Sequence, residues 1–152
     1  MIAMAVAFIS CNRKTEVVQN YGTGEISRKF ITIDGKKEGL MSDYYPDGSL
    51  KGERFFENDI QVGKTTIYYQ SGKIKEVQYY VDGIVHGGDT IFYENGSPEF
   101  VVTFDRGIKH GYLRKWSLEG ELTYEAKYQN DILVEVKGEV IKPDTTRKVP
   151  TF

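Results

Sequence analysis

The sequence predicts an all-β fold, a single-layer antiparallel meander of repeated 24-residue β-hairpins. The first observation behind this prediction is composition: the chain holds 11 Tyr, 8 Phe and 1 Trp, beside 16 Gly and only 4 Pro. Aromatic side chains suit a pleated surface, and glycine permits tight turns between short strands. The second observation is a 24-residue period, which places residues of one kind in register along most of the chain.

Glycines define the period most clearly. One glycine column holds Gly39, Gly63, Gly87 and Gly111, and a second holds Gly48, Gly72, Gly96 and Gly120. Aromatic columns keep the same register: Tyr44, Tyr68, Phe92 and Trp116 form one, Tyr45, Tyr69 and Tyr93 the next, and Phe56, Tyr80, Phe104 and Tyr128 a third. We expect these glycines to be structural and the chain to be one unit copied about four times.

Each unit has the pattern of a strand of about six residues, a glycine turn, a strand of about seven and a second turn. Pro46-Asp47-Gly48 and Asn95-Gly96 are turn signals, because proline presets φ and the other residues accept left-handed backbone. Successive hairpins make every strand antiparallel to its neighbour. The predicted organisation is a signal-like segment at 1–11, a polar tether at 12–20, a repeat domain at 21–142 and a tail at 143–152.

The N-terminal segment from Met1 to Ile9 carries no charge and is too short to span a bilayer, which needs about 20 residues. The stretch Phe8-Ile9-Ser10-Cys11 resembles a bacterial lipobox, which implies that Cys11 is lipidated and anchors the chain to a membrane. The missing basic stretch before it indicates a start upstream of Met1. The alternative is a buried N-terminal strand with an inert cysteine. Cys11 is the only cysteine, so no disulfide forms within one molecule.

The triplet Gly63-Lys64-Thr65 resembles the end of a phosphate-binding loop but does not fit one. That loop requires a glycine at position 58, where this chain has Asn58, and a helix after the triplet. The residues that follow have the pattern of a strand, so Gly63 is assigned to the repeat. A formal charge of −2 likewise gives no reason to expect nucleic acid as a partner.

No residues converge in a pattern that predicts catalysis, a metal or a cofactor. His86 and His110 occupy one column, in turns beside glycines, and lie two strands apart, about 9–10 Å. A zinc ion bonds each histidine nitrogen at about 2 Å, so histidines this far apart are poorly placed to share one. Carboxylates are dispersed over turns and a mixed-charge strand face, and no EF-hand pattern for calcium is present.

The stacked units resemble MORN repeats, and more closely the bacterial MORN-variant type, over roughly residues 21–133. The carrying motif is the spacing of Gly63, Tyr68-Tyr69, Gly72, Tyr80 and Gly83, which the neighbouring units share. The fourth unit departs from it with Trp116-Ser117 and Asp131, and the first with Asp59. Proteins of this type are often labelled antitoxin components, and MORN repeats elsewhere are associated with membrane or protein binding.

The sequence therefore predicts a non-catalytic repeat scaffold, an envelope lipoprotein that binds an unidentified protein or glycan. The alternative is a cytoplasmic antitoxin that neutralises a partner by direct contact. Tyr and Trp dominate binding hot spots in protein interfaces. The candidate contact residues are the two aromatic rows: Tyr45, Tyr69 and Tyr93, or Tyr44, Tyr68, Phe92 and Trp116. These aromatics could equally serve only to stabilise the sheet.

Overall fold

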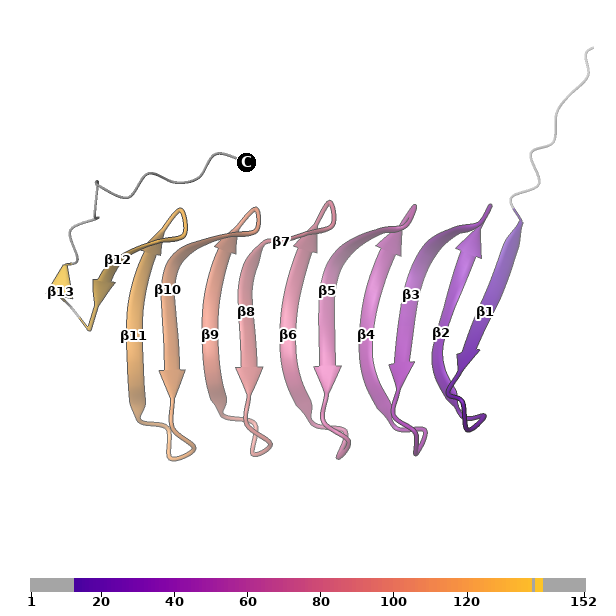
Figure 1. Cartoon of the computed structure of the whole chain (residues 1–152), viewed down its shortest axis with the longest axis horizontal. Helices are drawn as coiled ribbons and strands as arrows, with labels where there is room; N and C mark the ends of the chain where they lie inside the picture. Colours follow the sequence, from indigo (N-terminus) through magenta and orange to yellow (C-terminus); the bar gives the residue numbers. More distant parts are fainter. Residues whose placement is uncertain (1–12, 138, 141–152) are drawn as a thin grey trace, which may run out of the picture.

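The computed structural model describes residues 13–137 and 139–140, which form one open antiparallel sheet of 13 strands (Figure 1). Neighbouring strands follow chain order, and the short β7 pairs with β6 beside β8. The strands are β1 Lys14–Asn20, β2 Ile26–Ile33, β3 Lys36–Tyr44, β4 Leu50–Glu57, β5 Ile60–Tyr68, β6 Ile74–Val81, β7 Ile84–Val85, β8 Gly87–Phe92, β9 Pro98–Asp105, β10 Ile108–Trp116, β11 Leu122–Gln129, β12 Ile132–Val136 and β13 Glu139–Val140. The expected single-layer meander is confirmed.

Five-residue turns join the two strands of each hairpin along the lower edge in Figure 1. In the turn from Tyr45 to Ser49, the Tyr45 amide donates to the Ser49 carbonyl at 2.8 Å, and the Gly48 amide donates to the Tyr45 carbonyl at 2.9 Å. Gly48 has φ 84°, a left-handed conformation that glycine adopts without steric cost. Hydrogen bonds from Ser49 and from the Gln70 amide lower the pKa of Asp47 to about 2.

Two-residue turns join the strands along the upper edge, and both of their residues have positive φ, as type I′ turns require. Asp59 and Asp131 replace glycine here, with φ 69° and 63°. Each Asp carboxylate accepts a bond from a backbone amide of the preceding unit, from Lys37 at 2.8 Å and from Lys109 at 2.9 Å. The two departures from the repeat pattern therefore tie neighbouring hairpins together.

The first glycine column lies inside strands, as bulges. Between β4 and β5, Arg54 alone faces the three residues 63–65, and Gly63 has φ 69°. Bulges bend a strand, and the downward strands curve near the upper edge in Figure 1. His110 lies at the same bulge position within β10, and His86 lies between β7 and β8. The prediction that the histidines lie in turns is therefore wrong, because the positive-φ glycine beside each marks a bulge.

The predicted tether at residues 12–20 is also wrong, because Lys14–Asn20 forms strand β1. It pairs with β2 from Lys14 opposite Ile33 to Asn20 opposite Ile26. The residues after it close the same five-residue turn as in the later units, which makes β1–β2 a further hairpin. The sheet therefore begins at Lys14. Cys11, the lipobox-like segment and the tail at 143–152 lie outside the described residues.

The buried apolar core is small. Among the described residues it consists of Met41, Val102 and Ala126, which are 2%, 4% and 1% exposed. Backbone pairing and rows of side chains across the strands therefore stabilise the sheet, as cross-strand pairs do in general.

Candidate binding site

The strand register separates the side chains of the sheet into two faces. Residues directly opposite each other on paired strands point to the same side. One row across the sheet, which defines the pocket face, is Gln19, Arg28, Asp43, Gly52, Ile67, Glu76, Ile91, Phe100, Lys115 and Tyr124. The other row, which defines the aromatic face, is Lys29, Ser42, Glu53, Thr66, Val77, Thr90, Val101, Arg114 and Glu125.

One predicted aromatic row lies on the aromatic face. The Tyr68 hydroxyl donates to Glu53 at 3.0 Å, and burial together with this carboxylate raises the pKa of Tyr68. Tyr44, Phe92 and Trp116 occupy the corresponding position in their hairpins, and all four side chains are half-buried. The row therefore presents a partly exposed surface at a regular spacing.

The second predicted row serves the fold directly. The hydroxyl of Tyr45 donates to the carbonyl of Tyr68 at 2.8 Å, in the next hairpin. Tyr69 and Tyr93 repeat the bond to Phe92 and Trp116 at 2.6 and 2.8 Å, and Tyr21 starts the series with a 2.5 Å bond to Tyr44. These bonds form a tyrosine ladder along the turns, a structural role for Tyr45, Tyr69 and Tyr93.

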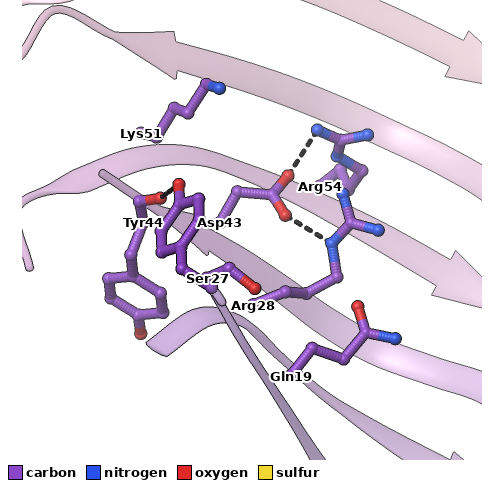
Figure 2. A pocket seen from close by; sticks show the side chains of 8 residues that line it. Gln19, Ser27, Arg28, Asp43, Tyr44, Lys51 and Arg54 are labelled. Carbon is purple, nitrogen blue, oxygen red and sulfur yellow. Dashed lines mark hydrogen bonds and ion pairs between the residues drawn. The ribbon is translucent and has the colours of Figure 1, made fainter. Parts of the chain in front are cut away.

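A pocket of about 390 Å³ lies at the N-terminal end of the pocket face. It is lined by Gln19, Tyr21, Ser27, Arg28, Asp43, Tyr44, Lys51 and Arg54 (Figure 2). Its centre is an ion triad: one Asp43 oxygen accepts from Arg28 Nε, and the other accepts from Arg54 Nη2 at 2.6 Å. The Asp43 side chain is 10% exposed, whereas those of Arg28 and Arg54 are 38% and 28% exposed.

A second polar cluster lies further along the pocket face. The Gln78 side-chain amide donates to Glu76 at 2.7 Å and to Asp89 at 3.1 Å, and Tyr80 donates to Gln78 at 2.9 Å. Burial raises the pKa of Glu76, and the negative charge of Asp89 adds to the effect. Burial likewise raises the pKa of Asp89, whose buried Oδ1 has no hydrogen-bond partner among the described residues.

The sequence did not predict the ion triad, although a signal for it was present. Arg28, Asp43 and Arg54 share their columns with Phe100, Ile91 and Val102, so the triad is a local break in the repeat. The histidines are not brought into one site: His86 Nδ1 lies 3.5 Å from Asp105 and accepts from the Arg106 amide at 3.3 Å. Over residues 13–137 and 139–140, no three potential ligands are grouped to hold a metal ion.

The fold and the pocket define a β-hairpin repeat protein with a side-chain surface on each face of a single sheet. Residues 37–58 and 61–82 match the family described as MORN repeat variant. The predicted resemblance is thereby confirmed over residues 37–82.

No curated protein matches the chain. One similar solved structure is titled "Crystal structure of accessory secretory protein 1,2 and 3 in Streptococcus pneumoniae". The similarity has a TM-score of 0.40 and 13% identity, and it covers 66% of this chain and 18% of that one. The chain thus spans about a fifth of that structure's chain. Among the described residues, none forms a helix long and apolar enough to cross a membrane.

Proposed function

We propose that this protein is a non-catalytic scaffold that binds a protein or glycan partner through the faces of its sheet. The observation that carries the proposal is the single layer: within the described residues, no second layer covers either face. In a two-layer domain such faces pack against each other and are unavailable to partners. Here they remain accessible over many strands.

The aromatic face supplies the favoured contact row, which is Tyr44, Tyr68, Phe92 and Trp116. The second row is less suited to a partner, because its hydroxyls already bond to backbone carbonyls of the next hairpin; it consists of Tyr45, Tyr69 and Tyr93. Half-buried aromatic side chains contribute large contact areas at low entropic cost, which is why they dominate binding hot spots.

The partner is identified by crosslinking and capture from the native cell. We expect the double substitution of Phe92 and Trp116 by Ser to reduce capture at least tenfold, with an unchanged circular dichroism strand signal. The matched control is Tyr124→Ser, which removes a half-buried aromatic from the pocket face. Equal loss in both variants contradicts use of the aromatic face, and a turnover activity abolished by one His or Glu substitution contradicts the scaffold.

The location proposed for the scaffold is the bacterial envelope, with a lipid on Cys11 as its anchor. Several acyl chains on one cysteine anchor a protein stably, whereas one chain binds only marginally. The test is metabolic labelling with palmitate of the protein made from its full gene, beside Cys11→Ala. Loss of label and of membrane fractionation in the variant supports the lipoprotein. An unlabelled protein supports the cytoplasmic alternative, an antitoxin-like binder.

A further inference from the structure

The pocket in Figure 2 carries more positive charge than its own carboxylate neutralises. Arg28, Lys51 and Arg54 face it with Asp43 as the single acid, a net charge of +2. Both Asp43 oxygens are already bonded to guanidinium groups. Arg28 bonds to Asp43 through Nε, its terminal N–H groups make no hydrogen bond to the described residues, and its side chain is 38% exposed. One bound carboxylate would lower this net charge to +1.

An arginine guanidinium presents its donors as a planar fork that matches a carboxylate. The site already holds one carboxylate, that of Asp43, by a single bond from each of two guanidinium groups. In Figure 2, Gln19 and Lys51 lie on either side of the triad. The Lys51 ammonium is 5.6 Å from the Tyr45 ring centre, a cation–π contact that restrains it beside the pocket.

The remaining lining is neutral and hydrogen-bonding. Gln19, Ser27 and Tyr21 surround the charged centre, and the bond from the Tyr21 hydroxyl to the Tyr44 carbonyl at 2.5 Å fixes the Tyr21 ring. A volume of about 390 Å³ exceeds what a lone carboxylate fills and falls in the range of small-ligand sites, about 300–1,000 Å³. The amide of Gln19 and the hydroxyl of Ser27 can form hydrogen bonds with a ligand that carries several hydroxyl groups, beside the ring of Tyr21.

The columns of the triad carry an Arg–Asp–Arg set at one place only, and elsewhere they hold other residues, among them Glu76, Gln78 and Lys115. Position by position, Arg28 corresponds to Phe100, Asp43 to Ile91 and Arg54 to Val102, all on the same face. The β8–β9 hairpin is therefore built without these charges. Local breaks of an otherwise consistent pattern are expected at functional sites.

We propose that this pocket binds an acidic sugar, a hexuronate residue, whose carboxylate pairs with Arg28 and Lys51 while its hydroxyls bond to Gln19 and Ser27. This assignment rests on the scaffold function proposed above and specifies a ligand for its second face. The ligand binds at the N-terminal end of the pocket face, where Tyr44 is the one residue of the aromatic row that also lines the pocket.

The test titrates the purified full chain with glucuronate and follows backbone amide shifts by NMR, with glucose and a pentaglutamate peptide as comparisons. We expect glucuronate to bind at least about tenfold more tightly than glucose, because charge-assisted bonds are the stronger ones. Added salt should weaken this binding, since the site is partly exposed. Shifts should centre on residues 19–28 and 43–54. Equal affinity for glucose, tighter binding of the peptide, or no binding overturns the proposal.

Arg28→Gln should weaken glucuronate binding about tenfold or more, and Arg28→Lys should recover part of it. The matched control is Arg114→Gln, which removes an arginine of similar exposure, 41% against 38%, from the aromatic face. If Arg28→Gln fails to fold, the exposed Lys51→Gln serves, and unchanged binding in it overturns the proposal. Partner capture that persists without any glucuronate binding rejects this ligand and leaves the scaffold function standing.

Discussion

The pocket face differs sharply between its N-terminal and C-terminal halves, although one hairpin backbone builds both. In the N-terminal half its central rows carry Arg28, Asp43, Arg54, Thr65, Gln78, Glu76 and Asp89. In the C-terminal half the same rows carry Ile91, Phe100, Val102, Leu113 and Ala126, with Lys115 and Tyr124 at the end of one row. Ion pairs and amide bonds lie beside the buried Met41 in the N-terminal half, whereas apolar packing around Val102 and Ala126 dominates the C-terminal half.

This difference shows that the repeat separates residues that hold the backbone from residues that give a surface its chemistry. The positive-φ glycines and the tyrosine ladder recur in both halves. The two central rows of the pocket face do not recur: they change from mostly charged or polar to mostly apolar, with Lys115 as a charged exception, while the antiparallel pairing continues. Stability experiments can therefore treat the two halves as matched contexts for opposite interactions.

Val102→Asp should give the largest loss of stability. Val102 is 4% exposed and lies directly opposite Asp89 and Leu113, so a new carboxylate there has no cationic partner and faces another acid. We expect the free energy of unfolding to fall by about 3–5 kcal/mol, measured by urea denaturation. The control is Val101→Asp, on the opposite face beside Arg114. Equal losses in the two variants contradict a buried apolar half.

Asp43→Asn should lower the free energy of unfolding by less than Val102→Asp does. The loss arises because two guanidinium groups are left without their shared carboxylate. We expect a loss of about 2 kcal/mol, since both arginines keep partial contact with water. Asp105→Asn is the control, because its side chain is 65% exposed. A loss no larger than that of the control means that the triad contributes nothing to folding.

Giving the N-terminal half of the pocket face the apolar residues of the C-terminal half tests most directly whether the backbone needs the charges. The triple variant Arg28→Phe, Asp43→Ile and Arg54→Val copies the residues that the β8–β9 hairpin places in these columns. Replacing a buried ion network by apolar side chains is often neutral or stabilising. We expect a gain of up to about 2 kcal/mol together with loss of glucuronate binding. A strong destabilisation means that the backbone of this half depends on its charges.

The sequence predicted what recurs and missed what does not. The 24-residue columns were sufficient to predict the strands, the antiparallel order and the two aromatic rows. Strand β1 was missed because residues 12–20 are polar and its hairpin precedes the first full unit. The triad was missed because residues 28, 43 and 54 become neighbours only when the register between β2, β3 and β4 is known.

The tyrosine ladder should respond equally in both halves. Tyr45→Phe removes a hydroxyl bond in the polar half, and Tyr93→Phe removes its equivalent in the apolar half. Each variant leaves one carbonyl acceptor without its partner, so each should lose about 1 kcal/mol. Losses that differ by more than about 0.5 kcal/mol would show that the ladder depends on the surface beside it.

Glu76→Gln should give the smallest effect, and with the opposite sign. The pKa of Glu76 is higher in the folded chain than its ordinary value of 4.5, mainly through burial and then through the charge of Asp89. The folded state therefore holds this proton more tightly than the unfolded state. The contribution of Glu76 to stability is favourable at low pH and decreases as the pH rises through the raised pKa.

A neutral amide at position 76 removes this penalty and can still accept the bond that Gln78 donates at 2.7 Å. Its N–H also offers a donor to the unpartnered Oδ1 of Asp89. We expect the variant to be more stable than the wild type at pH 7, by less than about 1 kcal/mol because the site is partly exposed, and to show no gain at pH 3.5. The control is Glu57→Gln, an exposed residue of β4. A gain that is independent of pH would place its origin in packing, not in the protonation of Glu76.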